Sequence, residues 1–111
     1  IFAHFKQLAP NSSVIFSTTT PVPEESLGRK AGDAAKFNHA ALGMLKDYPE
    51  VAINDLYALT KPNQTKWWVK PGNVHYNKTG SNAQGDEVAK VILKVLSDRG
   101  TSEGDAVNRA P

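Results

Sequence analysis

The feature that most constrains the fold is that only two segments of the chain have the pattern of a strand. Residues 14–20 and 51–53 are short, rich in β-branched residues and bounded by turn residues. A stretch with a helical apolar pattern separates them. Parallel strands need a crossover of roughly a dozen residues or more, so this order predicts a right-handed parallel βαβ unit.

Three helices are predicted around the two strands. Residues 1–9 carry apolar groups at helical spacing and are followed by Pro10, which stops a helix. Residues 34–48 form an amphipathic helix between the strands, with Asp33 as its N-cap and a proline directly after it. The third helix spans about residues 82–98, where valine, isoleucine and leucine recur at helical spacing.

The remaining segments are polar or rich in proline and glycine. Residues 21–32 and 60–73 are expected to form loops. Residues 99–111 contain one valine and no other large apolar residue, so we expect a disordered tail there. The folded part is accordingly placed at residues 1–98.

Two parallel strands do not make a domain on their own. Parallel sheets are covered by helices on both faces and usually contain more strands. The first strand would also leave an open apolar edge, which invites association. The chain starts at Ile1 rather than at a methionine. We therefore expect the C-terminal part of a doubly wound α/β domain whose earlier strands lie outside these 111 residues.

Composition excludes several classes of protein. The 13 basic and 11 acidic residues give a formal net charge of +2, too small and too dispersed to predict nucleic-acid or membrane-surface binding. The absence of cysteine excludes disulfides, thiolate catalysis and cysteine-based metal sites. No apolar run approaches the roughly 20 residues that span a bilayer.

Among the three histidines, His75 is the candidate for chemistry. His4 and His39 lie on predicted helices with no carboxylate at a useful spacing, and no histidine has the spacing of a metal-ligand cluster. No glycine-rich phosphate loop follows either strand, so no cofactor is predicted. His75 lies on a loop before the last helix, which can bring its imidazole to the carboxyl ends of the strands. Ligands gather there in open α/β sheets, and histidine suits proton transfer near neutrality.

The order of several short motifs resembles that of a bacterial SGNH (GDSL-like) hydrolase. The resemblance covers residues 1 to about 97. Its motifs are residues 14–23, 37–41 (Phe-Asn-His-Ala-Ala) and 51–57, followed by 73–76 (Asn-Val-His-Tyr), Gly80-Ser81, Gln84-Gly85 and Val88-Ala89.

The resemblance implies a flavodoxin-like three-layer α/β/α fold, of which this chain is the C-terminal part with parallel strands. It also implies ester hydrolysis by a serine nucleophile and a histidine base, with an oxyanion hole of backbone amides and an asparagine side chain. The family's catalytic histidine maps to His75, whereas the Gly-Asp-Ser block with the nucleophile lies outside this chain. The expected activity is that of a serine acylhydrolase for small acyl esters, including acetylated carbohydrates. Such a protein is typically secreted or periplasmic.

One departure from the family pattern concerns the group that orients the histidine. The family usually has an aspartate three residues before it, where this chain has Gly72. The amide of Asn73 is one replacement, although it stabilises an imidazolium less than a carboxylate does. A backbone carbonyl is another, and Asp55 at the end of the second strand is a third. Without a carboxylate, the full enzyme would work with a Ser–His dyad. The competing interpretation of Asp55 is a cap for the following turn.

Two pairs of residues are candidates for binding the substrate. Thr19 and Thr20 stand at the end of the first strand and either line a pocket or belong to a β-branched strand end followed by a capped turn. Trp67 and Trp68 either stack on a sugar ring or pack over the last helix. An alternative function follows from Gly72 and these tryptophans, namely a degenerate SGNH-fold module that binds a glycan or an acylated ligand. The expected partners are a small-molecule ester or acylated carbohydrate and the missing N-terminal part of the same domain.

Overall fold

The computed structural model describes residues 1–24 and 26–108, which contain two strands and several helices. The two strands are separated by one long helix, as the sequence predicts. The elements are α1 (Phe2–Leu8), β1 (Ile15–Ser17), the 3-10 helix η1 (Ser26–Gly28), α2 (Asp33–Leu45), β2 (Ala52–Asn54), α3 (Leu56–Thr60), the 3-10 helix η2 (Lys61–Asn63), α4 (Gln64–Trp67) and α5 (Lys78–Asn108).

The sheet consists of β1 and β2 in parallel, which confirms the α/β class and the parallel pairing. Phe16 lies opposite Ile53 in the register. The ladder continues just beyond the strands, because the Thr18 N–H donates to the Asn54 carbonyl oxygen at 3.0 Å. Within the part of the chain that the structure describes, β2 is the only strand beside β1. One edge of β1 therefore has no strand neighbour there.

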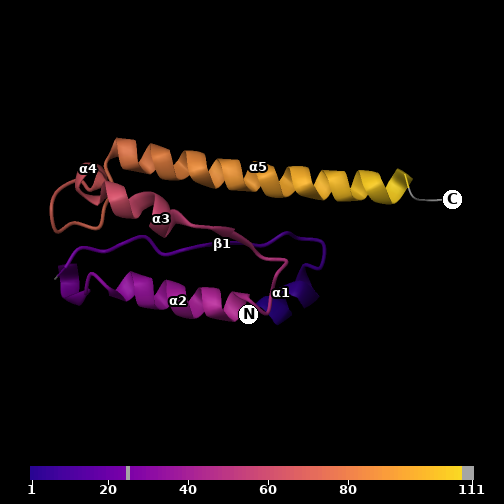
Figure 1. Ribbon diagram of the computed structural model, residues 1–111, viewed down its shortest axis with the longest axis horizontal. Coiled ribbons are helices and arrows are strands. Elements are labelled where there is room, and N and C mark those ends of the chain that lie inside the picture. The colour runs from indigo at the N-terminus through magenta and orange to yellow at the C-terminus, as the bar shows by residue number, and fades with distance from the viewer. Residues whose placement is uncertain (25, 109–111) are drawn as a thin grey trace.

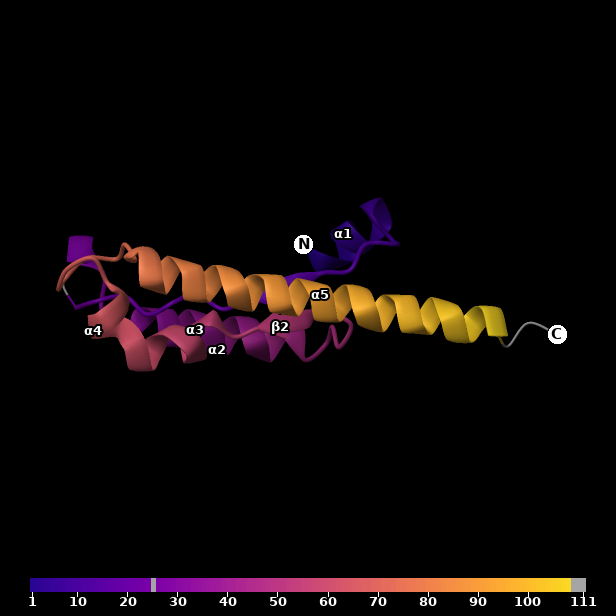
Figure 2. The same ribbon diagram turned by 90° about the horizontal axis from the view of Figure 1, so that it is seen from above.

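The helices place the two ends of the sheet in different surroundings. Helices α2 and α5 run along opposite sides of the strands (Figure 1). The carboxyl ends of β1 and β2 point toward the end of the molecule where α4 and the loop before α5 lie (Figure 1, left). Helix α1 lies toward the other end, and the last turns of α5 extend past the rest of the chain (Figure 2).

The buried core is small and half polar. Its buried hydrophobic residues are Ala34 and Leu45 of α2 and Val51 before β2. Large apolar side chains remain exposed on most elements of the described part: Ile1, Phe5, Leu8, Leu27, Phe37, Met44, Ile53, Val69, Ile92, Leu93 and Leu96. A complete domain of ordinary size buries far more apolar surface than this.

Several predicted boundaries in the first half of the chain are wrong. The first strand was expected to span residues 14–20, but β1 covers only Ile15–Ser17. The Thr18 N–H still donates to the Asn54 carbonyl oxygen, whereas the Thr19 N–H donates to the side chain of Asn38 rather than to β2.

Helix α2 ends at Leu45 rather than at residue 48, several residues before the proline that was expected to stop it. Asp33 is the first residue of α2 rather than its N-cap, a position that Gly32 takes. The Asp33 carboxylate instead accepts the Lys30 N–H at 3.1 Å, which closes the turn before the helix.

Two further predictions are wrong in the second half. The expected loop at residues 60–73 contains η2 and α4. The last helix begins at Lys78 and continues to Asn108, beyond the predicted end at residue 98 and into the predicted tail. No proline interrupts this stretch, and a Lys94–Asp98 ion pair of 2.9 Å joins successive turns. Residues 109–111 of the predicted tail lie outside the described residues.

Candidate functional site

The loop that carries His75 is fixed against the segment after α4. Trp68 and Tyr76 form an antiparallel bridge. The Val69 N–H donates to the carbonyl oxygen of His75 at 2.9 Å. These backbone contacts hold the exposed imidazole of His75 on a defined turn at the carboxyl end of the sheet.

Asn77 joins this loop to two helices at once. Its backbone N–H donates to the Trp67 carbonyl oxygen at 2.7 Å, and its side-chain amide donates to the Lys66 carbonyl oxygen at 2.7 Å. Its Oδ1 accepts the Gly80 N–H at 2.9 Å, which caps the first turn of α5. The sequence analysis missed this role, although an asparagine directly before a helix is the signal that predicts it.

Gly80 allows α5 to approach α4 closely. A Cβ atom at this position would lie 2.7 Å from Cβ of Trp67. Gly80 is buried, so a larger residue could not turn its side chain into solvent. The contact sets the position of the first turn of α5, and with it the end of the His75 loop.

Asn73 orients the imidazole of His75. The Asn73 Oδ1 lies 2.7 Å from His75 Nδ1 and also accepts the backbone N–H of His75 at 2.8 Å. The backbone bond identifies this atom as the amide oxygen, because an amide nitrogen could not accept it. Since the oxygen can only accept, Nδ1 of His75 must carry the proton. The other ring nitrogen, Nε2, then has a free lone pair in the neutral imidazole.

Gly72 lies in the turn directly before this contact. Its φ of +75° lies in the left-handed region, which glycine enters at little cost. Of the three orienting groups that the sequence left open, the structure thus brings the Asn73 amide to the ring.

Asp55 takes the capping role. Its Oδ1 accepts the Ala58 N–H at 3.1 Å, as the N-cap of α3, and the hydroxyl of Thr18 at 2.9 Å. The same hydroxyl accepts the Tyr57 N–H at 2.9 Å. Across the described ranges, no hydrogen bond or ion pair joins Asp55 to His75.

Thr19 and Thr20 occupy the loop at the carboxyl end of β1. The backbone of Thr19 is bound by Asn38 of α2, whereas its side chain is exposed. Thr20 is half-buried. Asn38 was not predicted as a site residue. The available signal was a polar residue on the buried side of an amphipathic helix.

The two tryptophans differ in their surroundings. Trp67 packs against Gly80 at the start of α5, as one of the two interpretations of the pair expects. Trp68 lines a shallow hollow with Pro23 and Tyr57, and the Lys61 ammonium lies 5.3 Å from the centre of the Tyr57 ring. The indole nitrogen of Trp68 is buried with no hydrogen-bond partner among the residues that the structure describes.

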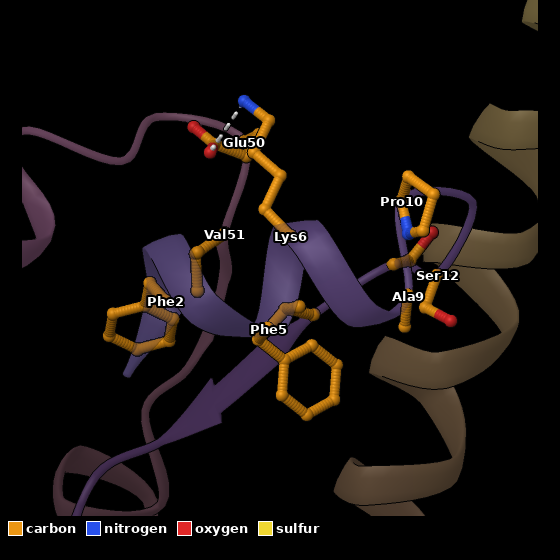
Figure 3. Close-up of a pocket in the computed structure, with 10 residues that line it drawn as sticks. Phe2, Phe5, Lys6, Ala9, Pro10, Ser12, Glu50 and Val51 are labelled. Atoms are coloured by element: carbon orange, nitrogen blue, oxygen red, sulfur yellow. Dashed lines mark ion pairs between the residues drawn. The ribbon is translucent and has the colours of Figure 1, made fainter.

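A second hollow lies at the opposite ends of the strands (Figure 3). Phe2 and Phe5 of α1 contribute rings to it, and Val51 closes it from the segment before β2 (Figure 3). The Lys6 ammonium pairs with the Glu50 carboxylate at 3.6 Å above these side chains. Ser12 and Ser13 also line this hollow, which contains no histidine.

No family model, curated protein or solved structure matches the chain. Over residues 1–24 and 26–108, no group of three or more histidine, cysteine, aspartate or glutamate residues could hold a metal ion. No helix in those ranges is long and apolar enough to cross a membrane. The pair formed by His75 and Asn73 is the arrangement in the described chain with the clearest chemical capability.

Proposed function

We propose that this chain is the C-terminal part of a flavodoxin-like SGNH esterase and supplies its general base, His75. The serine nucleophile belongs to a part of the same domain outside these 111 residues. The observation that carries the proposal is the 2.7 Å contact from Asn73 Oδ1 to His75 Nδ1, which leaves Nε2 as the free acceptor. A general base must present an unprotonated atom to the nucleophile.

The chemistry divides between the two ring nitrogens. Nε2 takes the proton from the serine hydroxyl as its oxygen attacks the ester carbonyl carbon, and returns that proton to the leaving alcohol oxygen. Water then attacks the acyl-enzyme, with Nε2 taking and returning a proton in the same way. Nδ1 keeps its proton throughout and donates it in a hydrogen bond to Asn73 Oδ1. A neutral amide stabilises the imidazolium less than a carboxylate, so we expect a slower enzyme than one with an aspartate.

The fold supports this placement of His75. Its loop lies at the carboxyl ends of both strands, where open α/β sheets bind their ligands (Figure 1). The unpaired edge of β1 and the exposed apolar residues, such as Phe37 and Met44 of α2, fit a sheet that continues into the missing part of the domain.

The same geometry favours an enzyme over the degenerate binding module. Gly72 replaces the usual aspartate, but Asn73 provides an acceptor at the same ring nitrogen. Packing of Trp67 against Gly80 argues against a free aromatic platform for a sugar ring at that residue. Small acyl esters are therefore the proposed substrates.

Hydrolysis of p-nitrophenyl acetate by the full gene product that contains these residues tests the proposal. We expect turnover, and a loss of about 10³-fold or more in kcat for His75→Ala. His39→Ala is the matched control, since His39 is an exposed histidine on α2. A folded His75→Ala protein with wild-type kcat would contradict the proposal, as would a gene product with no Gly-Asp-Ser segment upstream.

A further inference from the structure

Asn38 binds both backbone groups of one residue at the carboxyl end of β1. Its Oδ1 accepts the Thr19 N–H at 2.8 Å, and its Nδ2 donates to the Thr19 carbonyl oxygen at 2.8 Å. The Asn38 side chain is 6% exposed, so water competes little for these bonds. The amide therefore satisfies both backbone groups of Thr19, as the backbone of a neighbouring strand would.

The residue before Thr19 is fixed just as firmly from the other side. Thr18 is 3% exposed and bonds through its backbone to β2 and through its hydroxyl to Asp55 and Tyr57 at the start of α3. Consecutive residues are thus tied to α3 and to α2. The Thr19 hydroxyl, by contrast, is exposed and has no hydrogen-bond partner within the described chain.

We propose that Asn38 is a positioning residue that holds Thr19 so that its free hydroxyl binds the alcohol part of the substrate. This inference rests on the proposed esterase function. A fixed backbone keeps the Thr19 side chain at one place at the carboxyl end of the sheet, where open α/β sheets bind their ligands. The substrate class that it selects is an ester whose alcohol part carries a hydroxyl group of its own, in preference to a plain alkyl ester.

The test compares two acetate esters of similar size, glycerol monoacetate and propyl acetate. Acetic acid release by the full gene product gives kcat/KM for each ester. We expect the hydroxylated ester to be preferred, and Thr19→Val to reduce that preference about three- to tenfold, mainly through KM. Thr65→Val, which changes an exposed threonine on α4, is the control and leaves the preference unchanged. An unchanged preference in Thr19→Val overturns the inference.

The role of Asn38 needs variants that separate positioning from folding. Asn38→Leu removes both bonds, and we expect it to lower the preference as Thr19→Val does. In Asn38→Asp, a protonated carboxyl can accept from the Thr19 N–H and donate to its carbonyl oxygen, whereas the ionised form cannot donate. The folded state favours the protonated acid, so the stability deficit against wild type should be small at pH 4 and larger at pH 7. If Asn38→Asp is destabilised equally at both pH values, the role of Asn38 in holding the Thr19 backbone is overturned.

The outcomes also separate this inference from the proposed function. If His75→Ala abolishes hydrolysis while the variants at Thr19 and Asn38 keep the wild-type preference, the esterase stands and the inference fails. If the wild-type protein hydrolyses neither ester, the proposed function fails, and the substrate role of Thr19 fails with it.

Discussion

The two ends of the sheet are built differently. At the carboxyl end, four polar residues each take part in at least two hydrogen bonds that join separate segments or close a turn. These residues are Thr18, Thr19, Asn73 and Asn77. At the amino end, α1 is held by a tilted contact between Phe2 and Tyr48 rings 5.3 Å apart and by an ion pair on the surface.

This difference shows where the chain specifies its own structure. Directional bonds between side chain and backbone fix the carboxyl end without a large apolar core. The amino end relies on apolar surface, and much of that surface remains exposed: the side chain of Leu8 is 73% exposed. Substitutions at the carboxyl end should therefore have larger effects than substitutions near α1.

The largest effect on stability is expected for Gly80→Ala. The new Cβ would lie 2.7 Å from Trp67, so α5 must shift, and the free energy of unfolding should fall by about 2 kcal/mol. Gly85→Ala is the matched control on the same helix, because no atom lies within 4 Å of its Cβ position. It should raise stability by about 0.5–1 kcal/mol. Urea unfolding measures both, and equal effects would refute the close approach of α4 and α5.

A smaller effect, on activity rather than stability, is expected for Asn73→Ala. Without the acceptor at Nδ1, the tautomer and the ring orientation of His75 are no longer fixed, and kcat should fall about tenfold. Asn73→Asp should restore activity and exceed wild type, since a carboxylate stabilises the imidazolium. Nitrogen NMR of the ring shows whether Nδ1 carries the proton in the wild-type protein. A proton found on Nε2 instead would contradict the proposed role of Asn73.

The smallest effect is expected at the amino end, for Lys6→Ala. The Lys6 and Glu50 side chains are 73% and 51% exposed, and such surface pairs contribute little. The free energy of unfolding should change by less than about 0.5 kcal/mol. A loss as large as that of Gly80→Ala would show that the amino end is specified as tightly as the carboxyl end.

The sequence pattern predicted the parts of the fold that local periodicity determines. The parallel strands, α1 and α2 follow from apolar spacing and proline stops. The contact from Asn73 to His75 was one of three candidates, because Asn73 is the polar residue nearest to the position where the resembled family has its aspartate. The helix after His75 was predicted too short, since two glycines and few apolar residues near its end resembled a tail.

The long-range polar contacts were beyond sequence reasoning. Asn38 reaches Thr19 across 19 positions, and Thr18 reaches Asp55 across 37. Nothing in the local sequence of Asp55 distinguishes a residue that orients a histidine from one that caps a helix. Only the fold decides between them, because it places Thr18 rather than His75 beside the carboxylate.

The backbone of Gly72 has a consequence for where a carboxylate can be introduced beside His75. Its φ of +75° is part of the turn that brings Asn73 to the ring. An aspartate at this position would enter the left-handed region at a cost of roughly 1 kcal/mol, and its carboxylate would start from a backbone shaped for a different residue. Asn73→Asp avoids this cost, because the Asn73 side chain already lies at the ring. A carboxylate is therefore introduced beside His75 more directly at residue 73 than at residue 72.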